Sequence, residues 1–352
     1  MVKECHGGIM EQAANNDWKK VVKQYTTPSR SKSIFQLVNS IGPYLIGWAV
    51  GYQAYKIHPI LAILTSLICT LFFLRIFIIF HDCGHGSFFK TKKWRTFWGH
   101  VCGVITFTPY WQWTRTHATH HRHTGNLDKR GIGDVDTATI EEYKNFSKIR
   151  KFWYMAKRNP FVMLLGGPIL LFMLQYRFTM KEDGPRERRS VYLTNILLVL
   201  KAVVFSQIFG LEFYLVYEFA TVFFGAFFGI YMFYVQHQFE DAYWSKSENW
   251  SYVDACLKGS SFLKLPKILQ WGTGNIGFHH IHHLSHRIPN YYLEKAHNEN
   301  KMFQSPPTLT IGSSLKSLNL VLFDEKNDKM ITYKEYRQLR HHQVEELKLA
   351  EA

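Results

Sequence analysis

Four long apolar runs restrict what this chain can fold into. They cover residues 34–53, 57–80, 191–209 and 212–235. A transmembrane helix needs about 20 predominantly apolar residues, and each run is close to that length. Only a few residues separate the two runs of each pair, so we expect two helical hairpins that cross a bilayer four times. The sequence therefore predicts an all-α integral membrane protein.

Two shorter apolar segments, residues 97–113 and 161–176, have a different character. The first is rich in Trp and Tyr, which is typical of segments in the membrane interface. The second has Gly166, Gly167 and Pro168 in its middle, and basic stretches flank it. If it crossed the membrane, one basic stretch would face outside, although cytoplasmic loops carry the Lys/Arg excess. We therefore expect both segments to be interfacial helices, with a helical cap on the cytoplasmic side of four spans.

This topology divides the chain into three parts. We expect an N-terminal cytoplasmic segment (residues 1–33), a membrane domain (34–301) and a C-terminal cytoplasmic tail (302–352). The polar start of the first part predicts no signal peptide. The tail has no long apolar run, and it contains a charged turn at 324–329 followed by a polar helix.

The chain is strongly basic, with 42 Lys and Arg residues against 27 Asp and Glu and a formal net charge of +15. Such an excess indicates binding to nucleic acid or to an anionic membrane surface. The apolar runs favour the membrane, so we expect no nucleic-acid partner. The cysteines form no CxxC pair, which argues against a zinc ribbon and a disulfide framework.

Histidines gather at three places, at the end of a run or in a loop. His81 and His85 are four residues apart, so they share one face of a helix. The pattern HxxHH occurs at 117–121 and again at 279–283, and His237 follows the fourth run. A crowd of imidazoles is unfavourable unless a metal shares their lone pairs. The candidate metal ligands are His81, His85, His117, His120, His121, His237, His279, His282 and His283.

Nine imidazoles exceed the needs of one ion, because a tetrahedral zinc takes four ligands and an octahedral ion takes six. Two metals fit the count, and imidazole suits iron, copper, zinc and nickel alike. A carboxylate-bridged di-iron protein would need two Glu-x-x-His motifs, and only Glu294 to His297 has that spacing. The HExxH motif of zinc proteases is absent. A metal transporter would place its histidines near the bilayer midplane, whereas these lie at span ends and in loops.

Three histidine motifs placed after paired apolar runs resemble those of the membrane fatty-acid desaturases. The flanking segments extend the similarity, and they are closest to acyl-lipid desaturases of bacilli and their cyanobacterial relatives. These segments are residues 75–83, 126–131, 234–241, 274–279 and 288–291, within a similarity that covers about residues 30–330. Gly84 and Gly86 stand where related sequences vary, but neither is a ligand.

The resemblance implies a non-haem enzyme in which the nine histidines bind two iron ions. It would use O₂ and external electrons from ferredoxin or flavodoxin to insert a cis double bond into an acyl chain of a membrane phospholipid. The similarity is closest to delta-5 enzymes, while delta-10 and delta-12 relatives share the motifs and a di-iron hydroxylase would use the same oxidant. Together with the topology, it implies a plasma-membrane protein with its active site on the cytoplasmic face.

Metal-bound histidines usually donate their second N–H to a carboxylate or a carbonyl. Candidates for this supporting role are Asp82, His123, Asp134, Glu240, Asp241, Asn275 and His286. Each carboxylate is equally compatible with a solvated loop position. We expect His280 and His297 to have structural or supporting roles.

Overall fold

The computed structural model describes residues 18–350, so residues 1–17 of the predicted N-terminal segment lie outside it. The first predicted hairpin is formed by α2 (Arg30–Ile57) and α3 (Pro59–His85), which pack against each other. His58 joins them, and its imidazole Nδ1 accepts a hydrogen bond from the backbone N–H of Ile60 at 3.2 Å. Proline at the first position of α3 suits a helix start, because that position needs no backbone donor.

The second hairpin is formed by α8 (Pro185–Phe209) and α9 (Leu211–His237), joined at Gly210. Its helix α9 packs closely on the first hairpin. A β-carbon on Gly225 of α9 would lie 2.2 Å from the ring of Phe73 on α3, and one on Gly51 of α2 would lie 2.2 Å from the ring of Tyr217. Small residues at these crossings let the helix backbones approach, as is common between membrane helices.

Within residues 18–350, three helices are long and apolar enough to cross a membrane: α3, α8 and α9, with mean hydropathies of 2.5, 1.8 and 1.6. Helix α2 is not among them, because polar residues such as Gln36 and Asn39 interrupt its apolar run. Four crossings would be reached if α7 (Lys148–Arg158) and the bent helical segment Val162–Arg177 formed one broken span. The predicted number of four spans therefore stays a prediction, whereas a membrane-type helical architecture is confirmed.

The predicted interfacial segments take two forms. Residues 97–113 cover the end of α4 (Lys92–Ile105) and the start of α5 (Tyr110–His123). The segment 161–176 forms two π-helical stretches, η1 (Val162–Gly166) and η2 (Pro168–Leu174), and the 3₁₀ turn η3 (Gln175–Arg177) follows. Together they bend by 71° against α7. A proline and two glycines at the centre favour this departure from a straight α-helix.

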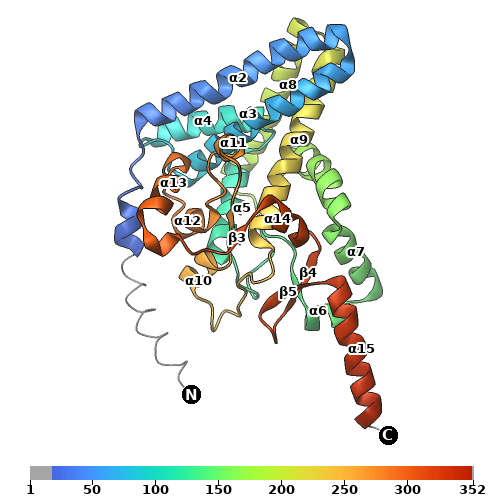
Figure 1. Ribbon diagram of the computed structural model, residues 1–352. Coiled ribbons are helices and arrows are strands. Elements are labelled where there is room, and N and C mark those ends of the chain that lie inside the picture. The colour runs from blue at the N-terminus through green and yellow to red at the C-terminus, as the bar shows by residue number, and fades with distance from the viewer. Residues whose placement is uncertain (1–17, 351–352) are drawn as a thin grey trace.

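Short elements form a layer on one side of the two hairpins, below them in Figure 1. We name residues 238–332 of this layer the cap. The helices of the cap are α10 (Tyr252–Leu257), α11 (Lys267–Gly272), α12 (His279–Leu284), α13 (Asn290–Glu299), η4 (Lys301–Phe303) and α14 (Ile311–Ser317). Buried apolar residues around Ile281, Ile288, Leu293 and Phe303 form their common core.

The helical prediction holds for most of the chain, but the structure adds two small sheets that the sequence analysis missed. One has the order β1-β4-β5, in which β1 (Ala138–Thr139) runs parallel to β4 (Leu320–Asp324) and β4 runs antiparallel to β5 (Lys329–Thr332). The other pairs β2 (Phe262–Leu263) with β3 (Thr308–Leu309). Strands of two residues leave no period-2 pattern, and β4 is almost wholly buried, so it resembles a short apolar run.

Near the first of these sheets, α6 (Ile140–Asn145) follows β1, and the predicted charged turn at 324–329 connects β4 and β5. The predicted polar helix is α15 (Tyr333–Ala350), which projects away from the other elements in Figure 1. The pairing of β4 with β1 ties the predicted C-terminal tail to the segment that follows α5.

A buried ion pair joins the two helices of the second hairpin. The ammonium Nζ of Lys201 on α8 lies 2.6 Å from Oε1 of Glu218 on α9, and their side chains are 9% and 6% exposed. Removing one partner of a buried pair leaves an uncompensated charge, whereas replacing both partners by apolar residues is often neutral.

We therefore expect Lys201→Met to lower the free energy of unfolding by roughly 3–5 kcal/mol. The double variant with Lys201→Met and Glu218→Leu should recover most of that loss. Thermal unfolding of the purified proteins in one detergent, followed by circular dichroism, measures both effects. Equal melting temperatures for wild type and Lys201→Met would show that this pair does not stabilise the hairpin.

Candidate metal centre

The histidines are carried by the ends of helices that meet between the hairpins and the cap. His81 and His85 occupy the last turns of α3, which ends at Gly86 with φ at +78°, a conformation that favours glycine. His237 is the last residue of α9. The two HxxHH motifs lie on α5 and on α12. Helix ends from distant parts of the sequence thus deliver all nine side chains to one place.

Nine histidines form two groups whose nitrogen atoms lie within 4.8 Å of one another in each group. Group 1 contains His81, His85, His117, His121 and His282. In group 1 the Nε2 atom of His121 lies 3.1 Å from Nε2 of both His117 and His282. Group 2 contains His120, His237, His279 and His283. In group 2 the Nε2 atom of His279 lies 2.9 Å from Nε2 of His237 and 3.1 Å from Nε2 of His283.

The HxxHH motifs are divided between the two groups. Neighbouring residues of an α-helix point about 100° apart, so His120 and His121 of α5 face different groups. His282 and His283 of α12 do the same. The rings of His121 and His283 stack with centroids 4.1 Å apart, which brings group 1 and group 2 side by side. Each HxxHH helix therefore supplies imidazoles to both histidine groups.

The electrostatics of the two groups favour neutral imidazoles. Seven of the nine side chains are buried, with exposed fractions of 5% or less, and His85 and His117 are partly buried. Burial lowers the pKa of five histidines on α5 and α12 well below the usual value, and neighbouring imidazoles lower it further. This pKa shift is found for His117, His121, His279, His282 and His283. Neutral rings keep the lone pair that a metal ligand needs.

Unpartnered nitrogens inside the cluster also fit a metal. The Nε2 atoms of His85 and His120 are buried and have no hydrogen-bond partner among the described residues. Buried polar atoms are nearly always satisfied, so these two imidazole nitrogens are suited to bind a metal. No carboxylate belongs to either group. An all-imidazole donor set suits iron, copper, zinc or nickel.

Two predicted carboxylates contact histidines of the groups. Asp134 forms a hydrogen bond with Nδ1 of His120, and Oδ1 of Asp82 lies 3.1 Å from Nδ1 of His81. A partner at Nδ1 orients the ring and leaves Nε2 for a metal. On group 2 the backbone carbonyl of Gly259 lies 3.4 Å from Nδ1 of His237 and has the same role.

Comparison with known proteins identifies the relatives of this chain. The sequence model of the Fatty acid desaturase family matches residues 57–310. The chain belongs to the fatty acid desaturase family. A "Fatty acid desaturase" of Bacillus subtilis (strain 168) is 42% identical over 329 residues, which are 93% of this chain and 94% of the relative.

Two cyanobacterial relatives are more distant. An "sn-1 oleoyl-lipid 12-desaturase" of Synechocystis is 26% identical over 300 residues, 80% of each chain. An "sn-1 acyl-lipid omega-3 desaturase (ferredoxin)" of Nostoc is 25% identical over 289 residues, 76% of this chain and 75% of the relative. The predicted family and the predicted class of enzyme, a desaturase that acts as an oxidoreductase, are thus confirmed.

The desaturase supports Asp82 with residues that the sequence analysis missed. Oδ2 of Asp82 accepts hydrogen bonds from the backbone N–H of Asn290 at 2.7 Å and from its side-chain amide at 2.8 Å. Gln36 of α2 donates to Oδ1 of Asn290 at 2.9 Å. The predicted Asn275 donates to the carbonyl of Asn290 at 3.2 Å, and Gln270 donates to its side-chain oxygen at 3.0 Å. Asn290 lies in the segment 288–291 that resembles other desaturases, and this was the available signal.

The other predicted supporting residues differ in their positions. The ring of His286 lies 4.9 Å from that of His85 and 5.6 Å from that of His121, between centroids, so it borders group 1. Glu240 and Asp241 are exposed, and Oε1 of Glu240 lies 4.0 Å from Nζ of Lys329. Among the residues that the structure describes, His123, Glu240 and Asp241 have no recorded contact with the nine histidines.

Histidines outside the two groups have structural partners. Nε2 of His280 lies 3.1 Å from the backbone carbonyl of Phe303. Burial lowers the pKa of His280 to about 3, so this ring is neutral and can donate to that carbonyl. The ring of His297 packs against the rings of Phe262 and Phe278. Both residues therefore stabilise the cap core.

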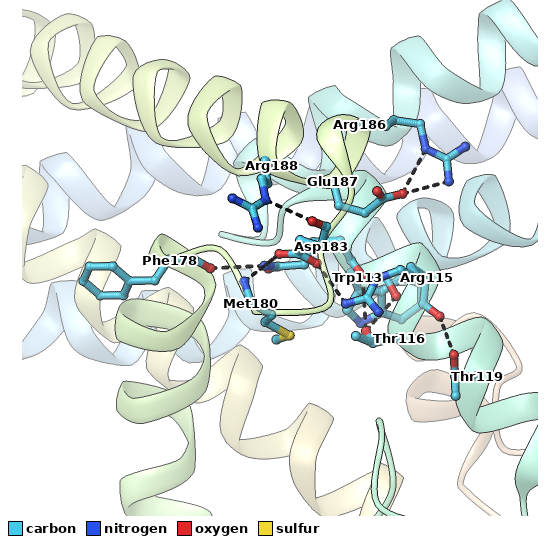
Figure 2. Close-up of polar contacts among 11 residues, drawn as sticks. Trp113, Arg115, Thr116, Thr119, Phe178, Met180, Asp183, Arg186, Glu187 and Arg188 are labelled. Carbon is cyan, nitrogen blue, oxygen red and sulfur yellow. Dashed lines mark hydrogen bonds and ion pairs between the residues drawn. The ribbon is translucent and has the colours of Figure 1, made fainter.

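Helix α5 is held in place by a buried carboxylate at the start of α8 (Figure 2). The Asp183 side chain is fully buried and accepts hydrogen bonds from Gln112 at 2.7 Å, from Arg115 at 2.9 Å and from the backbone N–H of Met180 at 2.7 Å. Gln112 and Arg115 lie within five residues of His117 on α5. This one carboxylate therefore links a membrane-type helix to the helix that serves both groups.

We expect Asp183→Asn to lower the free energy of unfolding by about 1–3 kcal/mol, because buried donors lose a charged acceptor. Glu182→Gln is the matched control, since the neighbouring Glu182 is exposed and its loss should change stability by less than about 0.5 kcal/mol. Thermal unfolding in detergent measures both variants. Equal effects of the two substitutions would contradict an anchoring role of Asp183.

Proposed function

We propose that this desaturase inserts a cis double bond into an acyl chain of a membrane phospholipid, with two iron ions held by the nine histidines. One observation carries the proposal: two adjacent all-histidine groups, of five and four residues, lie in a chain of the desaturase family. Two adjacent groups support the two-metal site that the count of nine imidazoles predicts.

The donor set fits iron. Imidazoles are neutral, so they leave a bound metal cationic and electrophilic. Bound iron would supply, with O₂ and external electrons, the oxidant needed to remove two hydrogens from an unactivated methylene. The chain itself orients the histidine rings and keeps water away from them. Asp82 and Asp134 hold the Nδ1 sides of His81 and His120, so that the Nε2 atoms face the groups. Burial of the histidines excludes water from them.

The substrate class and the bond position rest on different arguments. The names of both cyanobacterial relatives refer to lipid-linked acyl chains, which supports an acyl-lipid substrate for this chain. The delta-5 position rests on the resemblance of the flanking segments to bacillar enzymes. A delta-10 or delta-12 position is the alternative, and one relative is named a 12-desaturase.

The membrane topology and the electron donor complete the proposal. We place the histidine groups and the cap on the cytoplasmic face of the plasma membrane, because this keeps the basic segments inside. The net charge of +15 would attract anionic headgroups and an acidic donor protein such as ferredoxin or flavodoxin. The name of the Nostoc relative includes ferredoxin, which supports this type of donor.

Analysis of lipid products tests the reaction. We expect expression in a host without unsaturated lipids to yield a new cis monoene, with the double bond at carbon 5 of the acyl chain. Gas chromatography and mass spectrometry of derivatised fatty acids locate the bond. A monoene at another position would correct the regiochemistry alone. A hydroxy acid, or no new product from an iron-loaded protein, would contradict the desaturation proposal.

Metal analysis tests the site. We expect about two iron ions per purified chain, and a loss of one or both in His282→Ala, because His282 supplies Nε2 to group 1. His280→Gln is the matched control: His280 is equally buried in α12 but lies outside both groups, and glutamine can still donate to Phe303. Unchanged iron content in His282→Ala would refute the assignment of group 1.

A further inference from the structure

A groove of about 1000 Å³ lies between α2 and α4, and none of the nine histidines lines it. Residues of α2 that are three or four positions apart form one wall, from Arg30 through Ile34, Val38 and Ile41 to Leu45. A stripe of α4 with the same helical spacing, from Trp94 to Val101, forms the opposite wall. The groove therefore follows two helices over several turns, unlike a pocket around one side chain.

The floor of the groove is apolar and closed, while its outer side is open. Leu37 and Phe88 are buried at its base. The hydroxyl of Ser33 on α2 donates to the carbonyl of Phe88 at 2.6 Å, so the start of α2 is tied to the segment that leads into α4. On the outer rim Val38 and Trp94 are 65% and 51% exposed. Apolar side chains this exposed, next to helices of membrane type, are suited to contact with lipid.

One end of the groove carries positive charge. Arg30 and Lys90 line this end, and no acidic residue lines any part of the groove. Both side chains are exposed, and neither forms an ion pair within the described residues. Helices α2 and α4 both begin at this end, so their positive dipole ends lie beside the two cations. The hydroxyl of Thr91 makes no capping hydrogen bond and adds a free polar group.

We propose that this groove binds an anionic phospholipid, with its phosphate between Arg30 and Lys90 and one acyl chain along α2 and α4. The polarity of the groove matches such a lipid from end to end. From Arg30 to Leu45 α2 rises about 22 Å, and half of a hydrocarbon core is about 15 Å thick, so the groove accommodates an acyl chain of one leaflet. Two cations without acidic partners select a lipid with net negative charge.

The lipid site is distinct from the histidine groups, but α2 connects them. Gln36 lies between the groove residues Ile34 and Leu37, and it holds Asn290, which in turn holds Asp82. A lipid that fills the groove packs against the same turn of α2. Lipid binding therefore stabilises the position of Gln36. Through Asn290, Gln36 supports Asp82, the carboxylate beside His81.

Gly42 offers a direct test, because it lines the groove and a β-carbon there would meet no atom within 4 Å. The full chain is placed in nanodiscs of phosphatidylcholine that contain a minor share of photoactivatable phosphatidylglycerol. After irradiation, peptide mass spectrometry locates the labelled residues. We expect labels on residues 30–45 and 94–101, and a decrease of about fivefold in Gly42→Trp, whose indole occupies the groove.

Two controls accompany Gly42→Trp. Val50→Trp places the same indole on an exposed position of α2 outside the groove, and labelling should stay within about twofold of wild type. Gly42→Ala leaves the groove open and should also label like wild type. Labelling of Gly42→Trp at the wild-type level would overturn the proposal. So would labels confined to other helices, or crosslinks between two copies of the chain through α2 and α4.

Charge reversal at Arg30 and Lys90 tests the headgroup, and it remains informative if Gly42→Trp does not fold. In wild type we expect photoactivatable phosphatidylglycerol to label the groove about fivefold more than a phosphatidylcholine probe. Arg30→Glu with Lys90→Glu should abolish that preference. Equal labelling of the wild-type groove by both probes would contradict the proposal that the groove recognises the headgroup by its charge. All readouts are independent of desaturation, so failure of the proposed reaction and failure of the lipid site are distinguishable.

Discussion

Burial of nine imidazoles in two adjacent groups is the constraint on which the rest of this structure depends. Each ring loses hydration, and burial without a compensating partner is unfavourable by several kcal/mol per polar group on apolar transfer scales. The rings therefore need partners on both nitrogens. The Nε2 atoms face one another at about 3 Å in each group, while carboxylates or carbonyls take the Nδ1 side of His81, His120 and His237. A metal bound by the Nε2 atoms would stabilise the buried imidazoles, and it would offset the free energy lost when they leave water.

Such a cluster requires rigid helix ends that arrive from different directions, and the hairpins provide them. Helices α3 and α9 pack against each other through contacts as close as Gly225 on Phe73, and they end at His85 and His237. The Lys201–Glu218 pair holds α8 to α9, and Asp183 joins the start of α8 to α5. The apolar helices thus fix the spacing of the histidine-bearing ends, whether or not all of them cross the bilayer.

The sequence predicts the parts of this arrangement that leave a local pattern. Apolar runs predict the two hairpins, and spacing such as His117, His120 and His121 predicts the ligand atoms. It does not predict that His120 and His121 serve different groups, because that depends on how α5 is rotated against α3 and α12. Asn290 and Gln36 leave no such pattern, because Asn290 contacts Asp82 over 208 residues of sequence and Gln36 contacts Asn290 over 254. Strands of two residues, such as β1, form only because tertiary contacts hold them beside β4.

Helix α2 shows why the less apolar first run matters. Its polar residues weaken it as a hydropathy signal, yet two of them, one turn apart on the same face of the helix, form hydrogen bonds to other elements. Ser33 closes the base of the lipid-facing groove on Phe88, and Gln36 supports Asn290 beneath the metal groups. N–H···O hydrogen bonds have donor–acceptor distances of about 2.7–3.2 Å, so a small shift of α2 would release Asn290 and then Asp82. The surrounding lipid and the orientation of His81 therefore depend on the same turn of one helix.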